Sequence, residues 1–222
     1  MCIISIMNKM LKTKKTLIVI MCTLLFSACK ASKGQPYATQ RDNAWSRNAC
    51  GAFSMAYYLA ETGQIPGSKV ESTAKKIYPK IKFDPSAGFG EYSDPFKIAQ
   101  EIAPYGSNVF FGMNLSNPQQ PGEKLMALFA KSVDTSQLKD ITDISSSLAK
   151  NQYVIEILVP RANVDYLAPM HNPLHYVLTY WKGDTLYTLD PGRGQEEPRQ
   201  NFIDGTTTRW SFCNSGIFVT PN

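Results

Sequence analysis

The sequence has few cysteines and few histidines, which limits the kinds of site it can form. Three of its 5 cysteines fall within the first 29 residues, so only Cys50 and Cys213 lie in the rest of the chain. Two cysteines are not the disulfide framework of a small secreted protein, although Cys50 and Cys213 could pair with one another in an oxidising compartment. His171 and His175 lack cysteine partners at the spacing of a zinc site. We therefore expect no metal centre.

A hydrophobic run long enough to span a bilayer is also missing. The apolar stretch over residues 16–26 is too short, but it follows four lysines and precedes the small residues Ser27 and Ala28, a pattern typical of a signal peptide. Residues 25–29 resemble a bacterial lipobox in which Cys29 is lipidated, except that Phe26 stands where an aliphatic residue is usual. Ordinary cleavage near Ala28 is the alternative. Both interpretations predict export, either as a cell-envelope lipoprotein or as a secreted protein.

The sequence shows no clustered stripe of lysine and arginine. Its net charge is +5, and removal of the four lysines in residues 1–28 leaves a net charge of only +1. We therefore expect no nucleic-acid partner. Contact with a membrane is expected only through the N-terminal lipid, and the protein is expected to be a monomer.

The order of the predicted elements indicates an α+β fold. Residues 1–28 are expected to be a signal peptide, 29–40 a flexible tether, and 41–222 a single domain. Helices are predicted over 50–62, from a Ser68-x-x-Glu71 capping box to just before Pro79, over 94–103, near 123–131 and over 144–150. The later segments 152–159, 175–190 and 217–219 are predicted to be strands. Helices that come first and strands that come later favour α+β over a doubly wound sheet.

Cys50 directly precedes a helical stretch, and this placement suits a nucleophilic thiol. The amides at a helix N-terminus and a neighbouring imidazolium both favour the thiolate, which is the reactive form. Gly51 removes side-chain bulk beside the sulfur, and the amide of Cys50 is placed to face an oxyanion. A cysteine before a helix can also be a small buried hydrophobic residue.

A hairpin late in the chain carries a histidine and an aspartate. If Lys182-Gly183 is the two-residue loop, His175 faces Asp190 directly, with their Cβ atoms roughly 5 Å apart. If Gly183-Asp184 is the loop, Asp190 faces Val177 and lies diagonal to His175. Either register places both residues at the open end of the hairpin, where a carboxylate could orient an imidazole. His171 is the competing histidine, and Asp190-Pro191 could instead be simple turn chemistry.

These two motifs resemble the papain-like cysteine peptidases. The segments Asn48-Ala-Cys-Gly-x-x-Ser and His175-Tyr-Val-Leu-Thr-Tyr-x-x-Gly-Asp-Thr-Leu-Tyr-Thr-Leu-Asp-Pro are similar to the bacterial branch that includes the double-glycine (bacteriocin leader) peptidases. The resemblance covers most of residues 40–192. It implies a helical half that begins with the nucleophile and an antiparallel β half. It also implies that Cys50 is the nucleophile, His175 the base and Asp190 the orienting acid.

The sequence departs from this family at the oxyanion donor. The family usually has a glutamine about six residues before the cysteine, and here that position is Ala44. Gln40, which lies ten residues before Cys50, is one substitute, and Asn43 or Asn48 is another. Gln40 is the preferred candidate because it matches the family's residue type and reaches further.

The sequence thus predicts a cysteine hydrolase that cleaves a peptide or peptide-like amide, without a metal or organic cofactor. Its substrate would be a protein segment or a cell-wall peptide. A non-catalytic papain-like surface binding module is the first alternative. A cell-wall amidase of the NlpC type is the second, although that type usually has a second histidine where this chain has Asp190.

Overall fold

The computed structural model describes residues 37–84, 91–130, 138–160, 174–206 and 210–222. The chain divides into two units, Met1–Gln35 and Pro36–Asn222, and only the second contains described residues. The expected signal peptide, the lipidation candidate Cys29 and the competing His171 all lie outside the described residues. Within the described part of the chain, no helix has the length and apolar character needed to cross a membrane.

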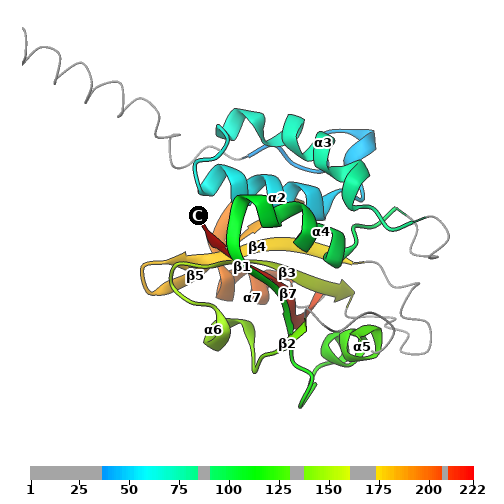
Figure 1. Cartoon of the computed structure of the whole chain (residues 1–222), viewed down its shortest axis with the longest axis vertical. Coiled ribbons are helices and arrows are strands. Elements are labelled where there is room, and N and C mark those ends of the chain that lie inside the picture. The colour runs from blue at the N-terminus through cyan, green and yellow to red at the C-terminus, as the bar shows by residue number, and fades with distance from the viewer. Residues whose placement is uncertain (1–36, 85–90, 131–137, 161–173, 207–209) are drawn as a thin grey trace, which may run out of the picture. The chain divides into compact units, whose positions relative to one another are not determined.

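A seven-stranded mixed sheet forms the centre of this unit (Figure 1). Its order is β2-β1-β7-β3-β4-β5-β6, and only the pair β1–β2 is parallel. Antiparallel pairing is therefore the rule, as the sequence predicts for its β half. The strands are β1 Gly106–Met113, β2 Leu138–Asp140, β3 Tyr153–Pro160, β4 His175–Lys182, β5 Thr185–Asp190, β6 Gln195–Pro198 and β7 Trp210–Pro221.

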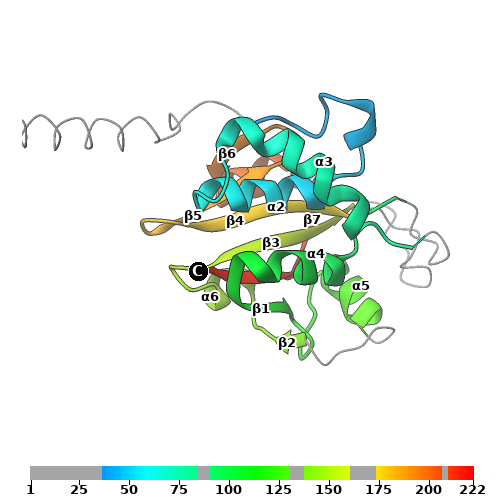
Figure 2. The ribbon, with the colours of Figure 1, turned by 45° about the horizontal axis from the view of Figure 1, so that its top comes forward.

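Helices cover both faces of the sheet. Helices α2, α3 and α4 lie on one face, and α6 and α7 lie on the other (Figures 1 and 2). The α+β class is therefore confirmed. The helices are α2 Cys50–Glu61, α3 Val70–Ile81, α4 Pro95–Ile102, α5 Pro121–Ala130, α6 Ile144–Ser147 and α7 Arg199–Thr206, with 3₁₀ turns at Ala44–Ser46, Gly67–Lys69 and Ala103–Tyr105.

Helix α2 is the central helix, buried from Cys50 to Leu59. It packs on β4, where alternate residues such as Tyr176 and Leu178 point toward it and are fully buried. Because successive side chains of a strand point to opposite faces, His175 and Val177 belong to the other face of β4. The packing of α2 along β4 also brings the start of the helix to the start of the strand, where Cys50 Sγ lies 3.8 Å from the carbonyl oxygen of Leu174.

The opposite face contains a buried ion pair. Glu156 on β3 is 0% exposed, and Arg199 at the start of α7 donates to its two oxygens from Nη2 at 2.6 Å and from Nε at 3.1 Å. The hydroxyl of Thr179 donates a further bond of 3.0 Å to Glu156. A buried carboxylate is tolerated only when it is paired in this way. The pair therefore holds α7 against the strands that carry His175 and Asp190.

Two helix predictions were accurate and one was not. Helix α2 ends at Glu61 with Gly63 at φ 75°, and the Asp94 side chain caps α4 by accepting from the amides of Phe96 and Lys97. The Ser68 capping box is wrong, because α3 begins at Val70 with no side-chain cap, and Pro79 lies inside this helix. Burial of Ile77, Tyr78 and Ile81 on the core side of α3 outweighs the hydrogen bond that proline removes.

The remaining predicted segments differ from the structure mainly in their ends: α5 is Pro121–Ala130, α6 stops at Ser147, β3 is Tyr153–Pro160 and β7 extends over Trp210–Pro221.

The sequence reasoning missed strands β1, β2 and β6 and helix α7. Strand β1 interrupts the predicted run of helices and pairs with β7 from the far end of the chain. Its segment contains Gly106 and Gly112, residues that are uncommon inside strands. Here the two glycines allow β1 to lie close to side chains of β7. A Cβ at Gly106 would lie 2.4 Å from Val219 Cγ2, and a Cβ at Gly112 would lie 2.7 Å from Phe218 Cε2.

The first of the two expected hairpin registers is wrong, and the second is correct. Leu178 pairs with Leu189 and Lys182 pairs with Thr185, so the loop is Gly183-Asp184. Gly183 has φ 63°, the left-handed conformation that a two-residue hairpin loop requires. In this register Asp190 lies diagonal to His175, not opposite to it.

Residues 37–40, which the sequence assigns to a flexible tether, are part of the folded unit. The Tyr37 amide donates to the Gly194 carbonyl at 2.9 Å, and the Gln40 amide donates to the Pro191 carbonyl at 3.0 Å. Tyr37 and Ala38 also pack against the main core. The tether prediction is therefore wrong at this end, and the segment is held against the turn that follows Asp190.

Gly51 sets how closely the start of α2 approaches α4. A Cβ at this position would lie 2.7 Å from both Cβ and Oγ of Ser93 and 2.8 Å from Cδ1 of Ile98. These distances are shorter than side-chain contacts allow, so a larger residue requires α2 to move. Gly51 therefore fixes the position of the neighbouring Cys50.

We predict that Gly51→Ala lowers the free energy of unfolding by about 1–3 kcal/mol, the usual cost of overpacking a core. Denaturant unfolding measures this cost. In a Ser93→Gly background the two nearest atoms are gone, so the same substitution should cost less. Equal costs in the two backgrounds would show that Ser93 does not limit this approach.

Candidate functional site

The site begins at the N-terminus of α2, where Cys50 is the first helical residue. The preceding Ala49 provides no side-chain cap, and the first amides of an α-helix have no intrahelical acceptor. Uncapped amides and the positive end of the helix dipole both favour a negative charge near Cys50. Cys50 and Cys213 are both free cysteines, which excludes the disulfide between them.

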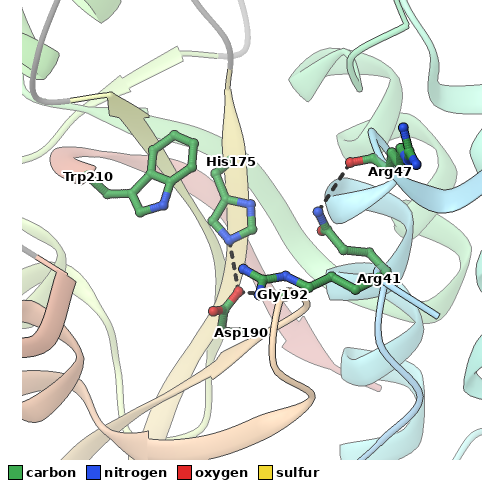
Figure 3. A pocket seen from close by; sticks show the side chains of 7 residues that line it. Arg41, Arg47, His175, Asp190, Gly192 and Trp210 are labelled. Atoms are coloured by element: carbon green, nitrogen blue, oxygen red, sulfur yellow. Dashed lines mark hydrogen bonds and ion pairs between the residues drawn. The ribbon is translucent and has the colours of Figure 1, made fainter.

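His175 and Asp190 form a buried hydrogen bond at the open end of the β4–β5 hairpin. His175 Nε2 lies 2.8 Å from Asp190 Oδ1, and the two side chains are only 9% and 10% exposed (Figure 3). An ionised carboxylate can only accept, so Nε2 is the donor and Nδ1 is the remaining ring nitrogen. The expected contact between this histidine and this aspartate is therefore confirmed, by way of the diagonal register.

Asp190 is held by the turn that follows it. Its Oδ1 accepts from the amide of Gly192 at 2.7 Å, and its Oδ2 accepts from Arg193 Nε at 3.3 Å. Its carbonyl accepts from the amides of Arg193 and Gly194. Burial raises the pKa of this carboxyl, but the hydrogen bond and charge of His175, with the Gly192 amide and Arg193, lower it below its usual value. Asp190 is thus an oriented anion.

The environment of His175 stabilises its protonated form. Burial lowers the pKa of the imidazole, but the hydrogen bond with Asp190 and the charge of that carboxylate, together with the nearby Cys50 thiol, outweigh burial and raise it to about 9. Since Nε2 bonds to Asp190, Nδ1 is the ring nitrogen that remains for a second partner. A thiol nucleophile with a general base requires a free ring nitrogen of this kind.

The sulfur of Cys50 has little contact with solvent. The residue is 3% exposed, and Sγ lies 3.8 Å from the carbonyl oxygen of Leu174, the residue before His175. A ligand must displace a neighbouring group to reach the sulfur in this arrangement. Cys50 itself is not among the residues that line the cavity beside it.

A polar cavity of about 310 Å³ lies against the His175–Asp190 pair. Trp210, at the start of β7, stacks on the His175 ring with centroids 5.1 Å apart and planes inclined by 25° (Figure 3). The indole shields the imidazole from solvent, which strengthens the bond to Asp190. The cavity is lined by Gln40, Arg41, Arg47, His175, Asp190, Gly192 and Trp210.

Of the three expected oxyanion donors, only Gln40 lines the cavity. Its Nε2 donates to the Arg47 carbonyl at 3.2 Å, and its Oε1 is buried without a partner in the described part of the chain. Asn43 instead donates to Glu71 Oε1 at 2.7 Å and so belongs to the contact with α3. Asn48 is half-buried and is not part of the cavity wall.

The sequence reasoning missed four residues of the cavity: Arg41, Arg47, Gly192 and Trp210. The run Asp190-Pro191-Gly192 could have revealed Gly192, since a glycine two residues after an aspartate is common turn chemistry. Its Cβ would lie 3.1 Å from Asp190 Oδ1, so a side chain here would crowd the carboxylate. No local pattern identifies Trp210, because only strand pairing between β3 and β7 brings it to the site.

Within the described residues, no group of three His, Cys, Asp or Glu side chains is placed to hold a metal ion. Comparison of the chain with protein-family models, with curated proteins and with solved structures gave no match. The arguments that follow therefore depend on the geometry of the site itself.

We predict that the His175 ring titrates near pH 9, well above the usual value of about 6.5. Because Asp190 stabilises the imidazolium, Asp190→Asn should move this titration to lower pH. The chain has 2 histidines, so proton NMR resolves them, and a His175→Gln variant assigns the signal. An unchanged titration in Asp190→Asn would contradict the pairing.

Proposed function

We propose that this protein is a cysteine hydrolase with a papain-like arrangement, which cleaves a peptide or peptide-like amide. The observation that carries the proposal is that His175 bonds to Asp190 through Nε2, while the Cys50 thiol at the start of α2 lies 3.8 Å from the carbonyl oxygen of Leu174, the residue before His175. A structural histidine needs the carboxylate but no thiol beside it. A carboxylate on one side and a thiol nearby support a role in which the ring exchanges a proton with sulfur while the carboxylate holds it in place.

In the proposed reaction, the sulfur of Cys50 attacks the carbonyl carbon of the amide. The proton held between sulfur and His175 goes to the leaving amine, and a thioester remains on Cys50. Water then attacks the thioester while His175 accepts its proton, and the carboxylic acid leaves as the thiol is restored. Asp190 keeps the ring oriented and stabilises the imidazolium in both steps.

The backbone amide of Cys50 and the side chain of Gln40 are the proposed oxyanion donors. Gln40 is held in place by its own backbone, since its amide bonds to Pro191 and its carbonyl accepts from the Ser46 hydroxyl at 2.7 Å. Its Nε2 has a second hydrogen beyond the one that bonds to Arg47. That hydrogen can serve an oxyanion when a substrate reaches the sulfur.

A non-catalytic binding module is the second candidate, and one observation favours it. Cys50 is 3% exposed, and the neighbouring cavity is lined by His175 but not by Cys50. A groove of this kind could bind a peptide without reaction. The two candidates differ in whether the native thiol reacts with an electrophile.

We propose as well that the protein is exported, with Cys29 as a lipid anchor or with cleavage near Ala28. The proposed substrate is then a protein segment or a cell-wall peptide outside the cytoplasm. Digestion of casein compared with release of peptidoglycan fragments separates a peptidase from a cell-wall amidase, the other hydrolase that the sequence leaves open.

We predict that Cys50→Ala abolishes hydrolysis and labelling by an electrophilic cysteine probe at this position. The substitution removes one buried sulfur, so it should cost about 1 kcal/mol and lower the unfolding midpoint by about 2–4 °C. Peptide mapping after labelling checks the position, and a thermal melt checks the fold. Cys213→Ala is the matched control, because Cys213 is also a free buried thiol, and it should retain labelling at Cys50.

We predict further that Asp190→Asn keeps the fold and lowers the rate of hydrolysis, because an amide can orient the ring but carries no charge. Losses of about 10²- to 10⁴-fold are the range expected for a group of this kind. Steady-state kinetics with the substrate that is cleaved, either casein or peptidoglycan, measures the loss. Full activity in Asp190→Ala would instead reduce the proposed site to Cys50 and His175.

A further inference from the structure

Two arginines on the wall of the cavity lack an acidic partner in the part of the chain that the structure describes. Arg41 and Arg47 both line the cavity and are exposed. Among the residues that the structure describes, neither forms an ion pair with a carboxylate, whereas the nearby Arg193 pairs with both Asp190 and Glu197. Unpaired guanidinium groups that face a cavity are suited to bind a carboxylate, often through two parallel hydrogen bonds.

The position of Arg41 relates it directly to the reacting groups. Its Nη2 lies 3.5 Å from the point that a Cβ on Gly192 would occupy, and the same point lies 3.1 Å from Asp190 Oδ1. Figure 3 shows the Arg41 side chain extending toward the His175–Asp190 pair. The backbone of Arg41 is held as well, since its amide donates to the Thr39 hydroxyl at 3.1 Å. The guanidinium is therefore placed beside the catalytic pair.

The charges around the cavity add to a positive field. The negative charge of Asp190 is balanced by its ion pairs with His175 and Arg193, so Arg41 and Arg47 add an excess of positive charge to the cavity wall. The hydrogen bond with Asp190 also favours the protonated form of His175. A cavity with positive walls raises the local concentration of anions.

We propose that Arg41, with Arg47 as a second positive charge on the same wall, binds a carboxylate of the substrate next to the bond that is cleaved. This inference rests on the proposed function, since it takes Cys50 as the reacting group. It makes the preferred substrate an acidic peptide, whose carboxylate is either an acidic side chain or a free C-terminus.

Two alkylating reagents that differ by one charge test this proposal without knowledge of the substrate. The Cys50 thiolate displaces iodide from iodoacetate, which carries a carboxylate, and from iodoacetamide, which is neutral; each forms an S–C bond and releases iodide. The ratio of the two rates at Cys50 is measured by mass spectrometry of the Cys50 peptide. Any change in the thiol itself affects both reagents, so the ratio reports the binding of the carboxylate.

Arg41→Gln should lower the iodoacetate-to-iodoacetamide ratio by about threefold or more, the effect of removing one charge near a carboxylate in a partly solvated site. Lys76→Gln removes the same charge from the exposed face of α3, and it should leave the ratio unchanged. An equal ratio in Arg41→Gln and in the unsubstituted protein would overturn the carboxylate site while leaving the nucleophile in place. Absence of reaction at Cys50 with either reagent would overturn the proposed function, and this inference with it.

Protection experiments distinguish the two sources of the carboxylate. N-acetylglutamine carries a free C-terminal carboxylate, N-acetylglutamate α-amide carries only a side-chain carboxylate, and N-acetylglutamine amide carries neither. The compound that slows iodoacetamide labelling of Cys50 more than the neutral amide identifies the source, and Arg41→Gln should remove that difference. If neither acid protects better than the neutral amide at equal concentration, the proposed substrate class is wrong.

Discussion

The buried hydrogen bond between His175 and Asp190 is the interaction on which the candidate site depends. At 2.8 Å, with both side chains at most 10% exposed, it lies where water competes little for either partner. Burial alone would discharge both groups, since it raises the pKa of a carboxyl and lowers that of an imidazole. Their pairing reverses both effects, so a charged pair persists in an interior position. The Gly192 amide and Arg193 then keep the carboxylate pointed at the ring.

The fold supports this pair from both faces of the sheet. On one face, α2 packs along β4 and brings Cys50 to the start of the strand that carries His175. On the other face, Arg199 neutralises the buried Glu156 and fastens α7 against β3. The N-terminal segment adds a third support, since residues 37–40 bond to the turn after Asp190 and position Gln40 and Arg41 at the cavity. Three distant parts of the chain therefore meet at one point, and each is held by its own contacts.

The charge distribution suits a site that handles an anion. Positive groups line the cavity, and its one carboxylate, Asp190, is already paired with His175 and Arg193. The local charge is therefore positive, whereas the chain without its expected signal peptide is nearly neutral overall. Net charge thus says little about what this site would bind. The arrangement that matters is the local one, in which two exposed arginines and a stabilised imidazolium share a wall.

Local chemistry in the sequence was enough to predict the helix that begins at Cys50, the hairpin that carries His175 and Asp190, and the α+β class. Each depends on neighbouring residues: a glycine stop, a two-residue loop, or a change from helical to alternating patterning. Tertiary structure decided what no local pattern contains. It selected the diagonal register, placed Trp210 over His175, turned Asn43 toward Glu71 and paired the glycine-containing β1 with β7. These outcomes depend on packing between segments far apart in the chain, and that packing can override the preferences of any one segment.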